Sequence, residues 1–383
     1  MCKSGSNGEW WRLPRADALG YYLTAPLGPE IRWLAAPKGR WIIPQSASPG
    51  NELLMTPPLF SSPDPELARA AFAQKPRGIV DKVLTVAEAV RRFVQDGDYF
   101  ASGGFGTNRI PTAVLHEILR QGKQGLGFAG HTTTHDFQIL CAGNLTGRGQ
   151  LLAKVDVSYI VGLEARGLSP HARRVVESGA VETLEWSNYT LALRFAAAAM
   201  GVPFLPARSL LGTDTLTHSA AKVIDCPFTG RKLVAVPALY PDVAAIHVHE
   251  ADRYGNCRFT GTSVADIDLA RAAKRVIITC ERLVPHDAMR RDPHLTTIPF
   301  LCVDAVCEVP FGSYPGNMPG EYFSDEDHLR LWLEVERDPA AFRQFLDDHI
   351  YGVREFTEYL DLCGGLRRLQ HLRQRELLLH LGR

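Results

Sequence analysis

From Val80 onward the chain alternates short apolar, β-rich runs with windows in which apolar residues recur at helical spacing. Parallel strands joined by helices produce this alternation, because the connection between two parallel strands must cross the sheet. The pattern therefore predicts an α/β fold with an open, mostly parallel sheet flanked by helices. The strands are predicted at residues 98–103, 124–130, 157–162, 202–207, 232–239, 243–251 and 275–280.

Helical windows lie between these strands, at residues 112–121, 170–178, 187–200 and 264–273. The third has the clearest ends, because Ser187 is a natural N-cap and Gly201 is a natural C-terminal stop. After the Gly/Pro-rich segment 311–322 the sequence becomes helical again. We therefore expect a main domain over residues 77–325 and a helical C-terminal segment over 326–383, which lies at a surface or an interface.

Residues 1–76 show no sustained helix or strand period, and they hold four of the six tryptophans. This part is expected to be irregular or disordered. Two explanations stay open: an extension that packs on a partner through its aromatic side chains, or an upstream stretch that is absent from the native protein. We favour the second, with Met55 as the true start, because the sequence after Met55 leads directly into a helix-like run.

Composition narrows the class of protein. Lys plus Arg equals Asp plus Glu at 42 each, and without a basic stripe the chain lacks the charge pattern of a nucleic-acid binder. The eight cysteines are scattered without C-x-x-C pairs, which indicates reduced thiols. No apolar run reaches the roughly 20 residues that span a bilayer, and the N-terminus has no secretory pattern. We expect a cytoplasmic protein.

The segment SGGFGTNRIP, residues 102–111, follows a predicted strand and opens a predicted helix. Its three glycines lack Cβ atoms, so backbone N–H groups there can approach a ligand closely. A dinucleotide fingerprint would need a glycine where Arg109 stands and an acidic residue after the next strand. Considered alone, the segment also fits a plain tight turn.

This segment is similar to the glycine-loop signature G-G-F-G-x-x-x-I-P of the A-type subunits of family I CoA-transferases. Later segments resemble the same family in the same order: VSYIVGLE (157–164), ESGAVE (177–182) with GVPF (201–204), ARSLLGTD (207–214), VPALYPDVAAIH (236–247) and ADRYGN (251–256). The segment ARSLLGTD is similar to the glutaconate branch in particular. The resemblance extends over residues 78–335 and implies a CoA-transferase A-type domain over residues 77–325, with a fold shared by sugar-phosphate isomerases.

The resemblance implies covalent catalysis, in which a glutamate attacks an acyl-CoA and carries CoA as an enzyme thioester. That glutamate belongs to the B-type subunit, in a motif like S-E-N-G that this chain lacks. Glu250 has the wrong neighbours for this role, and Glu164 stands at an A-type position where relatives carry a polar residue. The chain is therefore expected to be the A-type (alpha) subunit of a glutaconate-like CoA-transferase, with coenzyme A as a substrate, no tightly bound cofactor and a B-type (beta) partner.

The glycine loop is expected to supply backbone donors to the thioester carbonyl, where one donor contributes about 2.7–4 kcal/mol. The residues assigned to this role are Gly103, Gly104, Phe105, Gly106 and Asn108. A side chain at Gly104 is expected to fill the approach of the thioester. Some relatives carry Glu-Asn after the proline of the loop, where this chain has Thr112-Ala113, so Asn108 is the candidate for the missing amide.

Substrate contacts are expected from Ser102, His131, Arg208, Ser209, Thr213 and Asp214. The guanidinium of Arg208 can bind both oxygens of a carboxylate, although a structural ion pair stays open. His131 ends a predicted strand at the edge where open α/β sheets bind ligands, and a structural role stays open for it too. His131 and His135 have no third ligand in register, so no metal site is predicted.

Two other functions stay open. The first is a hydrolase or ring-cleaving enzyme of the same architecture, as in steroid-catabolic relatives, and the partner's nucleophile would distinguish it from a transferase. The second is a non-catalytic ligand sensor, which the absence of a DNA-binding segment makes the weaker alternative.

Overall fold

The computed structural model describes residues 57–145, 149–159 and 167–381, with no side chains described beyond 378. The predictions on residues 1–56, including a start at Met55, lie outside the described residues, as do Glu164 and residues 160–162. No helix in the described ranges is long and apolar enough to cross a membrane. The cysteines in these ranges are all free thiols.

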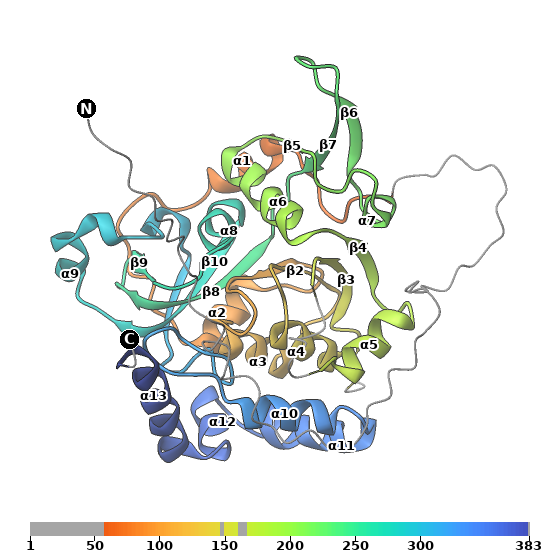
Figure 1. The fold of residues 1–383 in the computed structure, drawn as a ribbon. Helices are drawn as coiled ribbons and strands as arrows, with labels where there is room; N and C mark the ends of the chain where they lie inside the picture. Colours follow the sequence, from red (N-terminus) through yellow and green to blue (C-terminus); the bar gives the residue numbers. More distant parts are fainter. Residues whose placement is uncertain (1–56, 146–148, 160–166, 382–383) are drawn as a thin grey trace, which may run out of the picture. The chain divides into compact units, whose positions relative to one another are not determined.

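An eight-stranded sheet forms the centre of the fold (Figure 1). Seven of its strands pair in parallel, in the order β11 (Ala305–Glu308), β10 (Arg275–Leu283), β8 (Val243–Ala251), β1 (Tyr99–Ser102), β2 (Leu126–Gly130), β3 (Leu152–Val157) and β4 (Glu182–Glu185). The short β9 (Cys257–Arg258) pairs antiparallel with β8. The predicted α/β fold with an open, mostly parallel sheet is therefore confirmed.

Helices cover both faces of this sheet. One face carries α2 (Val86–Phe93), α3 (Thr112–Arg120), α4 (His135–Gly143) and α5 (Pro170–Glu177). The other face carries α1 (Pro65–Phe72), α6 (Asn188–Met200) and α8 (Asp266–Ala272). Alternate residues of a strand point to opposite faces, so Phe100 belongs to the first core and Ala101 to the second.

The α6 helix shows how local sequence sets an element. The Ser187 hydroxyl accepts the Thr190 N–H, and Thr190 reciprocates at the Ser187 backbone, which forms a capping box. Gly201 ends the helix with a φ of +71°, a conformation that favours glycine. Both predicted ends of this helix are confirmed.

The strand predicted at residues 157–162 is wrong, because β3 runs from Leu152 to Val157 and residues 158–159 lie beyond it. The pattern of apolar residues did not indicate this strand, because Lys154 and Asp156 interrupt it. Asp156 is nevertheless buried, because it accepts hydrogen bonds from three side chains: Tyr99, Trp186 and Arg194. A buried carboxylate with such partners is tolerated inside a sheet.

Two further predicted strands lie outside the main sheet. Residues 202–207 and 232–239 contribute β5 (Phe204–Ala207) and β7 (Lys232–Pro237) to a separate antiparallel sheet. Its third strand, β6 (Lys222–Asp225), was not predicted and forms a hairpin with β7 that extends away from the main sheet (Figure 1). The short chain between β6 and β7 allows only antiparallel pairing.

The C-terminal segment is helical, as predicted, with α10 (Glu326–Val335), α11 (Pro339–Leu346), a π-helix at Asp347–Tyr351, α12 (Phe356–Leu362) and α13 (Gly365–Leu381). It is more than a surface group, because Trp332, Phe342 and Tyr359 are fully buried in the core that α3 and α4 share. The α1 helix also differs from the irregular conformation expected up to residue 76. Asp64 caps this helix and Ala68 packs into the second core.

Candidate active site

The glycine loop leaves the carboxyl end of β1, between β8 and β2. Gly103 continues the strand, and its N–H donates to the Ala245 carbonyl at 2.8 Å. Gly104 then turns the chain with a φ of +92°, and a Cβ there would lie 2.4 Å from the Asn108 carbonyl oxygen. Gly104 is therefore required by the turn itself. This is a reason that the sequence analysis did not give, since a side chain would collide with the loop's own backbone.

The N–H groups expected to bind the thioester oxygen are already hydrogen-bonded within the protein. The N–H of Gly104 donates to Asp266 (2.8 Å), that of Phe105 to Asn108 (3.0 Å), that of Gly106 to Thr132 (2.9 Å) and that of Asn108 to Phe105 (2.9 Å). These donors hold the turn. Along residues 103–109, Thr107 alone has a backbone N–H without a hydrogen-bond partner in the described part of the chain.

Arg109 and Asp266 form a buried ion pair behind the loop, which the sequence reasoning missed. Both side chains are fully buried, and the guanidinium binds both carboxylate oxygens, at 2.8 and 3.1 Å. Arg109 also donates to the Thr262 carbonyl at 2.6 Å and stacks on Phe259. Because Asp266 accepts the Gly104 N–H as well, this pair fixes the loop to α8. The only sequence signal was a charged residue inside a glycine-rich turn.

Asn317 holds the loop from the opposite side, and the sequence reasoning treated its Gly/Pro-rich segment only as a connection. The Asn317 N–H donates to the Thr107 carbonyl, and the Arg109 N–H donates to the Asn317 carbonyl, both at 2.9 Å. The Asn317 amide also donates to Asn108 Oδ1 at 2.6 Å. The Asn108 side chain is therefore engaged within the protein as well.

Ser102 ends β1, and its hydroxyl points into the protein. It donates to Asp136 Oδ2 at 2.6 Å, and Asp136 also accepts the backbone N–H groups of Thr134 and Phe137. Burial raises the pKa of the Asp136 carboxyl to about 6, while the hydrogen bond from Ser102 opposes the shift. Ser102, predicted to contact substrate, thus joins β1 to the first turn of α4.

His131 follows β2 and lies against the glycine loop. Its ring stacks on the half-exposed ring of Phe105, with the centroids 5.5 Å apart, and Nδ1 lies 3.2 Å from the Thr132 hydroxyl. Burial lowers the pKa of His131, and a hydrogen bond with the Asn188 backbone opposes this shift. The imidazole is therefore neutral at pH 7 and remains able to share hydrogen bonds.

The predicted acid-binding loop follows β5, where Leu210 adopts a φ of +76°. Ser209 lies at the start of α6, with its Oγ 3.4 Å from the Ser187 hydroxyl. Since His131 contacts the adjacent residue Asn188, the structure brings Ser209 and His131 to the same helix end. Thr213 donates to the Leu210 carbonyl and is exposed.

Arg208 and Asp214 are exposed at the rim of this loop. Neither side chain forms an ion pair with another described residue, so the structural pair that stayed open for Arg208 is not found there. An exposed guanidinium without a partner can bind an incoming carboxylate.

Other titratable groups near the loop are engaged. Glu281 on β10 is buried and accepts hydrogen bonds from His247, Tyr322 and the Phe311 N–H. Burial alone would raise the pKa of Glu281, but the hydrogen bonds keep it below its usual range. Within the described ranges no group of three or more His, Cys, Asp or Glu side chains could hold a metal ion.

The part of the chain that contains this site matches known proteins. The family model for coenzyme A transferase matches residues 83–309. The A-type chain of glutaconate CoA-transferase from Acidaminococcus fermentans is 33% identical, over 75% of this chain and 93% of its own. The A-type chain of 3-oxoadipate CoA-transferase from Pseudomonas knackmussii is 37% identical, over 73% and 96%.

The solved structure of the Acidaminococcus fermentans glutaconate enzyme superposes with a TM-score of 0.72 at 32% identity, and covers 76% of this chain and 95% of that one. A protein of Archaeoglobus fulgidus is 48% identical, over 79% of this chain and 67% of its own. The glycine loop, the ion pair behind it and the loop after β5 all lie within residues 83–309. The chain therefore belongs to the coenzyme A transferase family.

Proposed function

We propose that this chain is the A-type subunit of a cytoplasmic, heteromeric CoA-transferase that moves CoA between an acyl-CoA and a free carboxylic acid. Coenzyme A enters and leaves as part of the substrates. The acid is of the glutaconate kind, a small organic acid whose free carboxylate meets Arg208. Relatives named as A-type chains of such transferases and the free thiols of the described residues support this proposal.

The glycine loop is the observation that carries the proposal. It stands at the carboxyl end of the central parallel strand, the position at which open α/β sheets bind ligands. The buried pair of Arg109 and Asp266 fixes one side of the loop, and Asn317 fixes the other. A surface held in this way needs no rearrangement when charge develops on a reacting carbonyl, which is the basis of electrostatic catalysis.

The nucleophile comes from the partner. The buried glutamates of the described residues are engaged: Glu281 as described, Glu117 with Arg120 and Gln121, Glu336 with Ser169 and Trp332, and Glu376 with the Gly320 N–H. A carboxylate of the B-type partner attacks the thioester carbonyl and releases the CoA thiolate, which leaves a mixed anhydride. The thiolate then attacks the glutamyl carbonyl, the first acid departs, and the incoming acid takes over CoA by the reverse steps.

Three groups of this chain contribute to those steps. The free N–H of Thr107 is the backbone donor for the oxyanion, and this replaces the five residues first assigned to that role. The exposed Arg208 binds the carboxylate of the acid, with Ser209, Thr213 and Asp214 beside it. The neutral His131, whose ring stacks on Phe105, shares a hydrogen bond with the substrate.

The test is to coexpress this chain with its B-type partner, incubate the complex with an acyl-CoA, and locate the CoA adduct by mass spectrometry. We expect a modified glutamate on the partner and none on this chain. The matched control replaces the glutamate of the partner's S-E-N-G-like motif by glutamine, which abolishes the adduct. An adduct on this chain would overturn the division of roles.

The same complex separates the other two functions. Release of free CoA without an acceptor acid, at the rate of transfer, would show a hydrolase. A complex that binds acyl-CoA but neither forms an adduct nor turns over would show a ligand sensor. Either result contradicts the proposal.

A further inference from the structure

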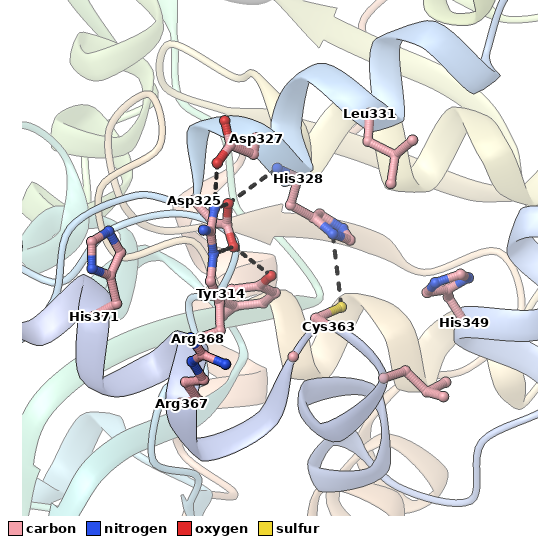
Figure 2. A pocket seen from close by; sticks show the side chains of 12 residues that line it. Tyr314, Asp325, Asp327, His328, Leu331, His349, Cys363, Arg367, Arg368 and His371 are labelled. Atoms are coloured by element: carbon pink, nitrogen blue, oxygen red, sulfur yellow. Dashed lines mark hydrogen bonds and ion pairs between the residues drawn. The ribbon is translucent and has the colours of Figure 1, made fainter.

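A cavity of about 690 Å³ opens between the segment 314–325 and the helices α10, α12 and α13 (Figure 2). Its lining residues lie beyond residue 309, where the match to the family model ends. The volume is within the range of roughly 300–1,000 Å³ that small organic ligands occupy. Nothing in the proposed transfer of CoA uses this cavity.

The acidic groups of the cavity are neutralised by arginines. The Arg368 guanidinium donates to Asp325 at 2.7 Å and to Asp327 at 2.8 Å, and Asp327 also pairs with Arg330. The Tyr314 hydroxyl adds a hydrogen bond to Asp325 at 2.8 Å, as Figure 2 shows. Asp325 and Asp327 therefore leave no free negative charge to attract a cation.

Arg367 is a cavity residue whose positive charge is not neutralised by an ion pair with a described residue. It lines the cavity from α13, is exposed, and has no ion-pair partner among the residues that the structure describes. His371 lies one turn further along the same helix and lines the same wall. A guanidinium without a partner in a cavity selects an anion, and it matches a planar carboxylate best.

The opposite wall is apolar. Leu331 on α10 is 42% exposed and Leu362 at the end of α12 is 56% exposed, and both line the cavity. The ring of His349 stacks on Phe345 with the centroids 4.1 Å apart, and its Nδ1 lies 3.0 Å from the Phe345 carbonyl. The ligand therefore has an apolar body as well as an anionic group, unlike an inorganic ion.

Binding in this cavity is not covalent. Cys363 is the only cysteine in the lining, and its Sγ lies 3.7 Å from His328 Nδ1. Burial raises the pKa of the Cys363 thiol to about 12 and lowers that of His328 to about 4. The pair therefore stays neutral as thiol and imidazole, and it supplies no thiolate nucleophile.

The wall of the cavity continues directly into the contact with the glycine loop. Asn317 lies between Tyr314 and Asp325 along the chain, and the Asp325 N–H closes this segment onto the Pro315 carbonyl at 2.9 Å. We propose that the cavity binds a small organic carboxylate with an apolar chain, and that its occupancy is transmitted to the glycine loop through Asn317. The effect on turnover rests on the proposed function, whereas the binding does not.

Octanoate, titrated calorimetrically into the complex of this chain with its B-type partner, tests the proposal. We expect saturable binding that Arg367→Ala weakens about tenfold, the effect of losing one charge-assisted hydrogen bond. The matched control Arg337→Ala removes an exposed arginine two residues after the end of α10, outside the cavity, and leaves binding unchanged. Hydrogen exchange at residues 103–109 slows when octanoate binds to the wild-type complex.

Three results would overturn the proposal: no saturable binding, equal binding by wild type and Arg367→Ala, or equal affinity for octanoate and inorganic phosphate. Octanoate bound in the active site would be lost in Arg208→Ala and kept in Arg367→Ala, which also contradicts it. Unchanged exchange at residues 103–109 would refute the coupling. A complex that binds octanoate in this pattern but transfers no CoA would refute only the proposed function.

Discussion

The buried pair of Arg109 and Asp266 gives the sharpest prediction. Asp266→Asn keeps an oxygen for the Gly104 N–H but removes the charge, so it leaves the Arg109 guanidinium buried without a counter-ion. Breaking a fully buried pair in this way costs about 3–5 kcal/mol, because the remaining charge keeps its desolvation penalty. A large domain loses about 2–4 °C of Tm per kcal/mol, so the melting temperature should fall by roughly 6–20 °C.

The assay is thermal unfolding of the purified chain, followed by tryptophan fluorescence. The matched control is Arg173→Ala, which breaks the exposed pair of Arg173 and Glu177 and should leave the midpoint unchanged. The double variant Arg109→Met, Asp266→Leu should recover part of the loss. It stays about 1–3 kcal/mol below wild type, because the Gly104 N–H then has no acceptor. A midpoint for Asp266→Asn equal to that of wild type would refute the reasoning.

Three more predictions follow from the site. Gly104→Ala should lower the melting temperature and the activity together, because its Cβ meets the Asn108 carbonyl at 2.4 Å. The control Gly106→Ala, whose Cβ meets nothing within 4 Å, should cost only about 1–2 kcal/mol of strain. Equal melting temperatures of the two variants would contradict this. Asp136→Asn should gain stability relative to wild type as the pH rises from 4 to 7, by up to about 3 kcal/mol. Burial penalises the ionisation of Asp136 in the folded state, where its pKa is about 6, so wild type loses stability as the carboxyl ionises. Urea unfolding at both pH values measures the difference in unfolding free energy between the variant and wild type. The same difference at both pH values would exclude this explanation. Arg208→Ala should raise KM for the acid about 10- to 100-fold and leave the melting temperature unchanged, since Arg208 is exposed; steady-state kinetics would disprove this if KM stayed the same.

Sequence patterns predicted the elements whose cause is local. The ends of α6 follow from Ser187 and Gly201, and the turn after β1 follows from its glycines. In both cases a single residue type satisfies a backbone requirement within a few positions. The similarity to a family then supplied the order of the motifs, which the family model over residues 83–309 supports.

The parts that escaped prediction depend on contacts between distant residues. Arg109 and Asp266 are 157 positions apart, and no local period marks either of them as buried. Lys154 and Asp156 hid β3 for the same reason, since the partners of Asp156 come from other elements. The role of the loop amides could not be predicted from the sequence either. The glycines show that the backbone can approach a ligand, but they do not show which acceptors inside the protein already bind its N–H groups.

The hydrogen bond from Asn317 to Asn108 has a consequence for biosynthesis. The two residues are 209 positions apart, so the ribosome releases the glycine loop long before it makes the residue that fixes it. Because domains are completed in step with synthesis at about 5–20 residues per second, the loop waits at least roughly 10 s for Asn317. The last strand of the main sheet ends at Glu308, so we expect the loop to be fixed on this side only after all strands of that sheet have been made.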